Sequence, residues 1–246
     1  MLVLGHRGGR GPDWPPENTL EAFQRALDEG ADGVELDVRL CASGEPVVAH
    51  DRTLARITSG SDRRPVLAVR RADLPRLVPG ARIPLLDEAL DLCHGRTVNV
   101  EVKADAPERA ALVRAVARAL ARARAADVVL SSFDPLFVLA FVAVARGVPR
   151  GVLVGPRTPR LATALPLAMR RVVSAAHLED GLATEARLDR LRAAGLRRVV
   201  WTVNDGARAA TLRGLGIEGL ITDRPAEILA AIDGHGAHGT GASRSI

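Results

Sequence analysis

Aromatic residues are almost absent from this chain of 246 residues. There is no tyrosine, and two tryptophans and four phenylalanines make up 2% of the chain, whereas 47% of the residues are hydrophobic. Proteins that bind single-stranded nucleic acids usually stack the bases on aromatic side chains, and this composition offers no such platform. Alanine, leucine and valine must therefore build the hydrophobic core.

Lysine is nearly absent as well. Of the 34 basic residues only Lys103 is a lysine, and the formal net charge is +5. The arginines are spread along every predicted helix between alanines and leucines, which is typical of solvated helix faces rather than of a nucleic-acid or membrane surface. One lysine kept among so many arginines suggests that position 103 needs a compact ammonium group.

Cysteines are few, and long apolar runs are missing. Cys41 and Cys93 show no CxxC spacing, so we expect reduced thiols rather than a disulfide framework. The N-terminal MLVLGHRGG lacks the charged and long apolar regions of a signal peptide. The apolar run Leu136–Ala145 is too short to cross a bilayer. We therefore expect a cytoplasmic protein without stable membrane insertion.

Short apolar segments alternate with amphipathic segments along most of the chain. A predicted helix follows each predicted strand, and the eight strands are expected at residues 2–5, 34–40, 97–103, 127–131, 150–154, 171–175, 198–203 and 219–222. Eight βα units in a chain of about 250 residues predict a closed (β/α)8 TIM barrel of the α/β class. A doubly wound open sheet is the alternative, and it would need fewer strands and one glycine-rich nucleotide loop.

We predict one domain over residues 1–233. Residues 52–82 are irregular and rich in Thr, Ser, Gly, Asp and Pro, so we interpret them as a small insertion after the second strand, over the barrel mouth and without a second core. Residues 234–246 are rich in Gly, His and Ser, and we expect them to form a disordered tail.

The stretch Val34–Asp51 carries the most informative pattern. Glu35 and Asp37 alternate with apolar residues, and in a closed barrel their face can point into the mouth, with the two carboxylates about 6–7 Å apart. A turn at Ser43-Gly44 can bring His50 back beside them. Two carboxylates and an imidazole suit a hard cation and a proton donor.

Other polar residues fall at the C-terminal ends of predicted strands, where barrel enzymes place their active sites. His6 and Arg7 end the first strand, and Glu101 and Lys103 lie on the third. Each motif alone is more typical of a turn or a solvated strand face. Charges gathered at one end of one barrel, however, would be costly to bury without partners.

Together these residues indicate a chemistry. Three carboxylates, Glu35, Asp37 and Glu101, form an oxygen-rich site for Mg²⁺ or Ca²⁺. The fixed cations beside them suit a phosphate group, and the two imidazoles could share proton transfer. This combination is typical of phosphoryl transfer or phosphodiester cleavage.

Nine short motifs resemble, in the same order, those of the glycerophosphodiester phosphodiesterase family. They are HRG, PENT, VELDV, PVVAHD, IPLLDEAL, VEVK, SSFDP, WTVND and GLITDRP, and the match runs from residue 3 to about residue 230. The resemblance implies a (β/α)8 barrel with an insertion after the second strand. It also implies metal-dependent hydrolysis of glycerophosphodiesters to an alcohol and glycerol 3-phosphate, in which the substrate's own glycerol hydroxyl could attack first and give a cyclic phosphate.

The resemblance also implies roles for individual residues. It makes His6 and His50 the general acid/base pair, Glu35, Asp37 and Glu101 the ligands of one divalent cation, Arg7 and Lys103 phosphate contacts, and Trp201 a packing surface for glycerol or the leaving group. The loop GRGPDWP, with Trp14, is longer than usual in the family. The fifth and sixth units carry no polar motif, and His177 could line the pocket or lie on the surface.

Two other functions stay open. The same fold and metal site could act on a lysophospholipid or another phosphodiester, although the predicted helices show no apolar membrane-binding face. The segment GHRGGRG resembles an RGG-type RNA-binding segment, so a non-catalytic basic binding protein is the third hypothesis. We expect a small-molecule partner and no nucleic acid, and the oligomeric state is not predicted.

Overall fold

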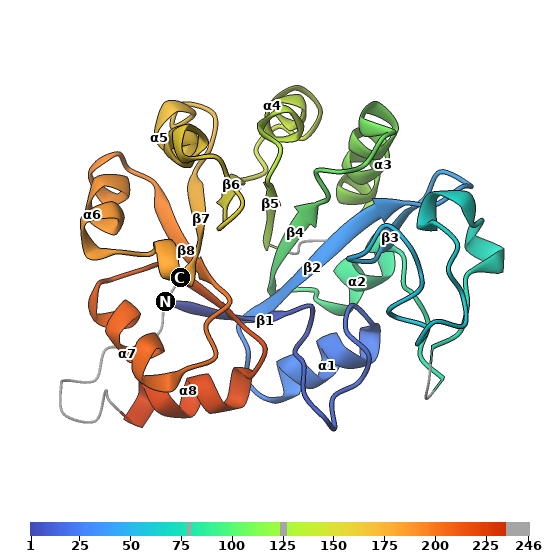
Figure 1. The fold of residues 1–246 in the computed structure, drawn as a ribbon, viewed down its shortest axis with the longest axis horizontal. Coiled ribbons are helices and arrows are strands. Elements are labelled where there is room, and N and C mark those ends of the chain that lie inside the picture. Colours follow the sequence, from blue (N-terminus) through green and yellow to red (C-terminus); the bar gives the residue numbers. More distant parts are fainter. Residues whose placement is uncertain (78–79, 124–126, 235–246) are drawn as a thin grey trace.

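Eight parallel strands close into a barrel, and helices surround it (Figure 1). The computed structural model describes residues 1–77, 80–123 and 127–234. The strands are β1 (Leu2–His6), β2 (Gly33–Leu40), β3 (Pro46–Val48), β4 (Thr97–Val102), β5 (Asp127–Ser132), β6 (Arg150–Val154), β7 (Ala175–Glu179), β8 (Arg197–Trp201) and β9 (Gly219–Thr222). The α-helices are α1 (Leu20–Asp28), α2 (Leu86–Leu92), α3 (Arg109–Arg122), α4 (Pro135–Val144), α5 (Leu165–Ala168), α6 (Glu185–Ala193), α7 (Gly206–Gly214) and α8 (Pro225–Gly234). Short 3₁₀ turns lie at Val66–Ala68, Arg71–Asp73, Arg160–Ala164 and Asp180–Leu182.

The strand order establishes closure. Hydrogen bonds run from β1 through β9, β8, β7, β6, β5 and β4 to β2, and β1 pairs with β2 as well. All of these pairs are parallel, and only β3 runs antiparallel, on the edge of β2. The predicted (β/α)8 barrel is therefore confirmed, and the open doubly wound sheet is wrong.

Burial explains why β2 looked half-exposed in the sequence. All eight of its residues are buried. Leu36 and Val38 belong to the core shared with the surrounding helices, whereas the alternate residues Glu35 and Asp37 are buried without being part of that core. Because a barrel strand has no solvent face at mid-height, polar residues in the period-two pattern lie inside the barrel.

The segment after β3 packs beside the barrel. In Figure 1 it lies next to β3 at the outer edge of the barrel. It shares a small apolar cluster with the β2–β3 hairpin, in which Leu54, Val66 and Ile83 pack with Cys41 and Val47. That it is an insertion within one domain of residues 1–233 stays a prediction, and the tail from residue 235 lies outside the described residues.

One predicted strand is wrong. We expected a strand at residues 171–175, but β7 covers Ala175–Glu179. Val172 and Val173 instead end the preceding turn, where both backbone amides donate to the carbonyl of Met169. The valines suggested a strand by propensity, but tertiary packing overrode it and gave the strand to a less typical segment.

The shift of β7 places His177 inside the barrel. Its side chain is 1% exposed, and neither ring nitrogen has a hydrogen-bond partner among the described residues. A Cβ atom at Gly151 on β6 would lie 2.4 Å from the ring, so glycine makes room for the imidazole there. Burial lowers the pKa of His177 to about 4.

His177 should make the stability of this protein depend on pH. The unfolded chain binds a proton at this histidine near pH 6.5 and the folded chain only near pH 4, so stability falls as the pH drops through that window, by up to about 3 kcal/mol. We expect His177→Leu to flatten the free energy of unfolding between pH 6.5 and 4.5, measured by urea titration with chelator. An unchanged slope in His177→Leu would contradict the assignment.

None of the helices in the described ranges is both long and apolar enough to cross a lipid bilayer.

Candidate active site

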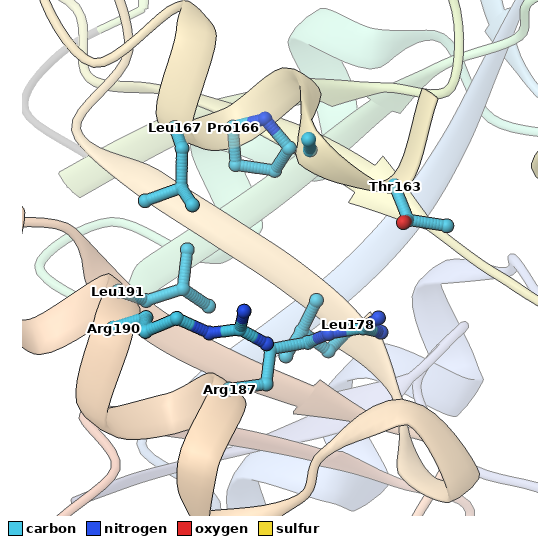
Figure 2. A pocket seen from close by; sticks show the side chains of 8 residues that line it. Thr163, Pro166, Leu167, Leu178, Arg187, Arg190 and Leu191 are labelled. Atoms are coloured by element: carbon cyan, nitrogen blue, oxygen red, sulfur yellow. The ribbon is translucent and has the colours of Figure 1, made fainter. Parts of the chain in front are cut away.

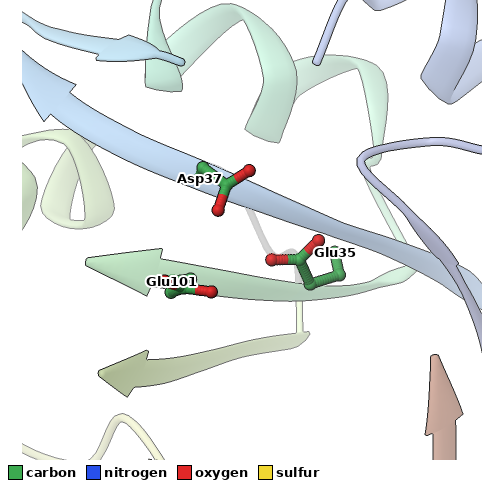
Figure 3. Close-up of side chains that lie close together, drawn as sticks. All are labelled: Glu35, Asp37 and Glu101. Atoms are coloured by element: carbon green, nitrogen blue, oxygen red, sulfur yellow. The ribbon is translucent and has the colours of Figure 1, made fainter. Parts of the chain in front are cut away.

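Three carboxylates from two neighbouring strands meet inside the barrel mouth. Glu35 and Asp37 lie on β2, and Glu101 lies on β4, where it pairs in register with Asp37. One oxygen of each carboxylate lies within 4.8 Å of the others (Figure 3). The predicted cluster is therefore assembled, and it can bind a metal ion.

The three carboxylates could hold a metal ion, and their pKa values are shifted in different directions. Burial, and then the charges of Asp37 and Glu101, raise the pKa of Glu35 well above its ordinary value. Burial also raises the pKa of Glu101. Burial alone would raise the pKa of Asp37 too, but the charges of Lys103 and Arg7 outweigh it and hold that pKa below its usual range. A divalent cation among three oxygens would relieve this repulsion, so the donor set fits a hard metal.

Two protein cations contact the same carboxylates. The Lys103 Nζ atom lies 2.6 Å from Asp37 Oδ1 and 2.6 Å from Glu101 Oε1. Arg7 has a left-handed backbone with φ of 54°, which turns its amide to donate to Glu35 Oε2 at 3.1 Å while its guanidinium lies 3.1 Å from Asp37 Oδ2. The compact ammonium that the sequence suggested at position 103 thus lies between two carboxylates.

His6 is held by an aspartate from the other end of the chain. Its Nδ1 atom lies 2.7 Å from Asp223 Oδ1, and its Nε2 atom lies 3.9 Å from Glu35 Oε2. A carboxylate on Nδ1 favours the proton there, which leaves the Nε2 lone pair for proton transfer. Burial lowers the pKa of His6, although the hydrogen bond with Asp223 opposes that shift.

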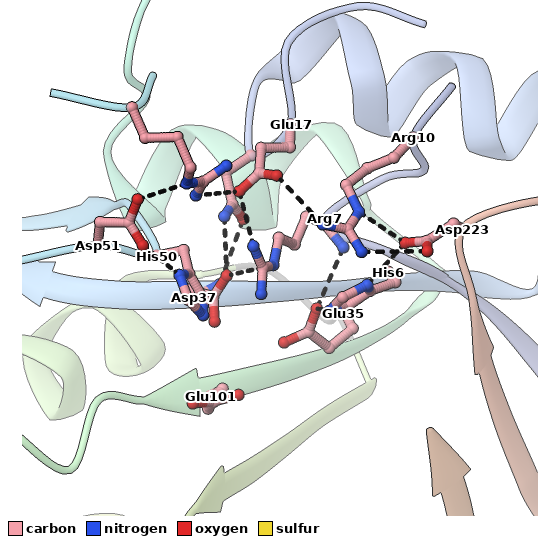
Figure 4. Close-up of polar contacts among 12 residues, drawn as sticks. His6, Arg7, Arg10, Glu17, Glu35, Asp37, His50, Asp51, Glu101 and Asp223 are labelled. Carbon is pink, nitrogen blue, oxygen red and sulfur yellow. Dashed lines mark hydrogen bonds and ion pairs between the residues drawn. The ribbon is translucent and has the colours of Figure 1, made fainter. Parts of the chain in front are cut away.

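His50 repeats the arrangement on the other side of the cluster. Its Nδ1 atom lies 2.6 Å from Asp51 Oδ1. Figure 4 places His50 beside Asp37, and His6 beside Glu35. Burial lowers the pKa of His50 as well. Two imidazoles, each oriented by an aspartate, thus lie on either side of the carboxylate cluster.

Glu17 connects the two histidine–aspartate pairs. It accepts from Arg7 Nη1 at 2.8 Å and from Arg56 Nη2 at 2.8 Å, and it lies 3.7 Å from Arg10. Arg56 continues to Asp51, and Arg10 continues to Asp223 through two hydrogen bonds. The result is one chain of charged contacts from His50 to His6 (Figure 4).

Several residues of this site were missed in the sequence. We assigned no role in the active site to Glu17, Asn18, Arg10, Arg56 or Asp223. Asn18 holds the site directly, since its Nδ2 donates to Asp37 Oδ2 at 2.8 Å, and Thr19 provides the cap of α1. The PENT and TDRP motifs were visible, but nothing in their spacing says which side chain turns towards His6 or Asp37.

Trp201 lies at the end of β8 and packs against apolar neighbours. Its ring meets Phe133 edge to face with 5.6 Å between the ring centroids. A Cβ atom at Gly155 would lie 3.2 Å from the Trp201 ring. These contacts place it at the rim of the mouth, between the ends of β5, β6 and β8.

A separate hollow lies between α5 and α6. Its volume is about 190 Å³, and the side chains around it include Pro166, Leu178, Arg187 and Leu191 (Figure 2). None of the carboxylates or histidines of the barrel mouth lines this hollow. We therefore locate the active site at the mouth, where the titratable groups are.

Comparisons with known proteins agree with this geometry. The protein YhdW of Bacillus subtilis (strain 168) is 28% identical over 236 residues, which cover 92% of this chain and 95% of YhdW. A phosphodiesterase of Oleispira antarctica, solved in complex with the product sn-glycerol-3-phosphate, superimposes with a TM-score of 0.83 and 26% identity over 95% of this chain and 97% of that one. A glycerophosphodiester phosphodiesterase of Thermotoga maritima gives a TM-score of 0.75 and 29% identity over 93% and 97%.

A family model also matches most of the chain. The model described as "Glycerophosphoryl diester phosphodiesterase family" matches residues 6–227, from the first histidine of the site to α8. The match thus includes the three carboxylates, both histidine–aspartate pairs, seven barrel strands in full and the last residue of β1. The chain belongs to the glycerophosphoryl diester phosphodiesterase family.

Proposed function

We propose that this protein hydrolyses glycerophosphodiesters to an alcohol and sn-glycerol 3-phosphate with the help of one divalent cation, Mg²⁺ or Ca²⁺. The observation that carries the proposal is the pair of aspartate-held imidazoles on either side of a buried three-carboxylate cluster. Membership of the family supports the reaction class, and the sn-glycerol-3-phosphate bound to the Oleispira relative supports the product.

Glu35, Asp37 and Glu101 are the residues that would hold the cation. The contact of Lys103 Nζ with two of them, at 2.6 Å each, supports this assignment, because it shows that the space between Asp37 and Glu101 suits positive charge. The bound cation would supply Lewis-acid polarisation of the phosphate and charge neutralisation.

His6 and His50 carry the proton transfers in this proposal. One imidazole takes, at Nε2, the proton of the attacking water or of the substrate's own glycerol hydroxyl, and the other delivers a proton to the leaving oxygen. If the glycerol hydroxyl attacks first, water opens the resulting cyclic phosphate in a second step. Asp223 and Asp51 keep the Nδ1 proton in place and stabilise the imidazolium that forms. The two pairs lie on different elements, so each can act on a different oxygen of one phosphodiester.

Arg7 and Lys103 bind the phosphate in this proposal, and Trp201 packs on glycerol or on the leaving group at the rim. Both cations already contact the carboxylates that would hold the metal. They therefore lie within reach of a phosphate bound at the same cation. We place the reaction in the cytoplasm, which fits the two free, buried cysteines Cys41 and Cys93.

The test is release of glycerol 3-phosphate from glycerophosphocholine and glycerophosphoethanolamine, with Mg²⁺, with Ca²⁺ and with chelator. We expect turnover only with metal, and a loss of about 10³-fold or more in His50→Ala. The exposed residue His94 provides the matched control, because His94→Ala should keep wild-type activity. Metal-independent turnover, or a folded wild-type protein inactive on both substrates, would contradict the proposal; higher activity on lysophospholipid would favour the second hypothesis.

A further inference from the structure

The outer face of α4 carries no charged side chain. All ten residues of this helix are apolar, and Phe137, Val138 and Phe141 fill the side that faces the barrel. The opposite side is open to solvent, where Leu136 is 54% exposed and Leu139 is 45% exposed. The α4 face consists of these two leucines with Phe133, Val142 and Val144, which are 37%, 36% and 46% exposed.

Such a group of exposed apolar side chains is unusual on this protein. In the described parts of the chain only one other large apolar side chain, Leu2, is comparably exposed. Scattered apolar residues on a surface need no explanation, but a contiguous apolar patch usually marks a contact with a partner or a lipid surface. We expected no apolar face suited to a membrane on any helix, but α4 has an exposed apolar face. We had judged its apolar run only by its length as a spanning segment.

The positive charge of the chain gathers around the same helix. Residues 109–178 contain eleven arginines and two aspartates, a formal net charge of +9, against +5 for the whole chain. In Figure 1 helices α3, α4 and α5 from this stretch lie side by side along one side of the barrel. The arginines are spread along the chain, as the sequence suggested, but this stretch holds only two of the 29 acidic residues that offset them elsewhere.

Most of these arginines have no acidic partner. Arg109 pairs with Asp134, and Arg122 pairs with Asp87. The other aspartate of the stretch, Asp127, is exposed at the start of β5. Within the described ranges no ion pair is found for the exposed arginines Arg114, Arg118, Arg146, Arg157, Arg160, Arg170 and Arg171. The α4 face therefore has flanks of uncompensated positive charge.

We propose that the α4 face docks this protein onto an anionic lipid surface. Leucine, valine and phenylalanine side chains enter the boundary between headgroups and acyl chains, and the flanking arginines contact the lipid phosphates. Charge complementarity favours this occupant over a second copy of the chain, because two faces with the same excess of positive charge repel each other. An RNA would match the arginines but would leave the apolar centre of the face without a partner.

Docking would bring the barrel mouth to the lipid surface. Phe133 follows the C-terminal end of β5, and its ring contacts Trp201 at the rim of the mouth. Leu136 is in the first turn of α4, so the apolar face begins beside the active site and continues down the side of the barrel. This consequence rests on the proposed function, and it suits substrates released from, or still embedded in, a lipid surface.

Vesicle sedimentation tests the docking without any catalytic readout. The wild-type chain should bind phosphatidylcholine vesicles that contain about one third phosphatidylglycerol, and binding to pure phosphatidylcholine should be much weaker. Leu136→Gln/Leu139→Gln should lower the partition coefficient by about 10-fold or more. Arg114→Gln/Arg118→Gln should lower it by about 10-fold and make binding less sensitive to salt.

Matched variants on other sides of the barrel serve as controls. Leu2→Gln changes the one comparably exposed leucine elsewhere, and Arg190→Gln/Arg192→Gln removes two exposed charges from α6. Both should bind vesicles like the wild type. All variants should keep the wild-type Tm and the wild-type hydrolysis of soluble glycerophosphocholine, because none of the substituted residues belongs to the active site.

The results separate docking from the alternatives. The proposal would be overturned if Leu136→Gln/Leu139→Gln bound anionic vesicles as strongly as the wild type, or if the wild type did not bind them. A wild-type dimer that this double variant dissociates, without vesicle binding, would make the α4 face a contact between copies and would also overturn it. Salt-sensitive binding to RNA without binding to vesicles would do the same. An inactive wild-type enzyme that still binds vesicles would count against the proposed function alone.

Discussion

Glu35→Gln should lower kcat/KM for a glycerophosphodiester by on the order of 10³-fold, because it removes one of three carboxylates that would hold the cation. The substitution keeps the size of the side chain and an oxygen that can accept from the Arg7 amide, so the local backbone should stay in place. Steady-state kinetics at several Mg²⁺ and Ca²⁺ concentrations measure the effect. Wild-type kcat/KM with an unchanged metal requirement in the variant would contradict the role of Glu35.

The same substitution should have the opposite effect on the metal-free fold. Burial and two neighbouring carboxylates raise the pKa of Glu35, so its ionised form costs stability at any pH above the ordinary carboxyl range. In chelator at neutral pH we therefore expect Glu35→Gln to melt at a higher temperature than the wild type. Added Mg²⁺ or Ca²⁺ should raise the Tm of the wild type and have little effect on the variant. Glu185→Gln on the exposed first turn of α6 is the matched control. It should leave the Tm unchanged both in chelator and with added Mg²⁺ or Ca²⁺.

Asp223→Asn should lower kcat by on the order of 10²- to 10⁴-fold with little effect on the fold of the barrel. The asparagine can no longer favour the Nδ1 proton of His6 or stabilise its imidazolium, although its size is the same. Arg10 loses its bidentate partner in this variant as well. Rates with saturating substrate and metal measure the effect, and a loss of less than about threefold would exclude Asp223 from the mechanism.

The pH profile of Asp223→Asn tests the cause of that loss. Asp223 raises the pKa of His6 against the effect of burial, so removing its charge lowers this pKa further. The limb of the rate profile that reports His6 should therefore move to lower pH, whether His6 acts as the base or as the acid. Asp51→Asn should give a smaller loss, because the His50–Asp51 pair is about one third exposed and water can replace part of its effect.

The fold could be predicted from local patterns. Apolar strand segments alternate with amphipathic helix segments, and this alternation leaves few ways to bury both faces of a parallel sheet. The wrong prediction of a strand at residues 171–175 shows the limit of local sequence patterns. Val172 and Val173 have a higher strand propensity than Ala175 or His177, but the register that closes the barrel required the later segment.

Part of the active site could be predicted for the same reason. Glu35, Asp37 and Glu101 lie on strands that the period-two pattern identifies, and parallel strands end at one edge of the sheet. Their approach to within 4.8 Å therefore follows from strand assignment and barrel closure. The positions of these three residues could therefore be predicted without knowing the conformation of any loop.

The partners of these residues depend on loops and on the opposite end of the chain. His6 and Asp223 are 217 positions apart in sequence and meet only because β1 pairs with β9 when the barrel closes. Glu17 joins the two histidine–aspartate pairs because the loop before α1 and the segment after β3 both reach the mouth. Such contacts have no period and no short spacing for a sequence pattern to detect.

By itself, the sequence determined the class of fold, the polar ends of the strands and the apolar composition of α4. Those properties are local, since they follow from the order and period of apolar residues. Only the tertiary structure decided which aspartate holds each histidine, that His177 is buried, and that the outer side of α4 stays exposed among arginines. Burial and charge partners are properties of the whole arrangement, because they depend on what residues distant in sequence place around each side chain.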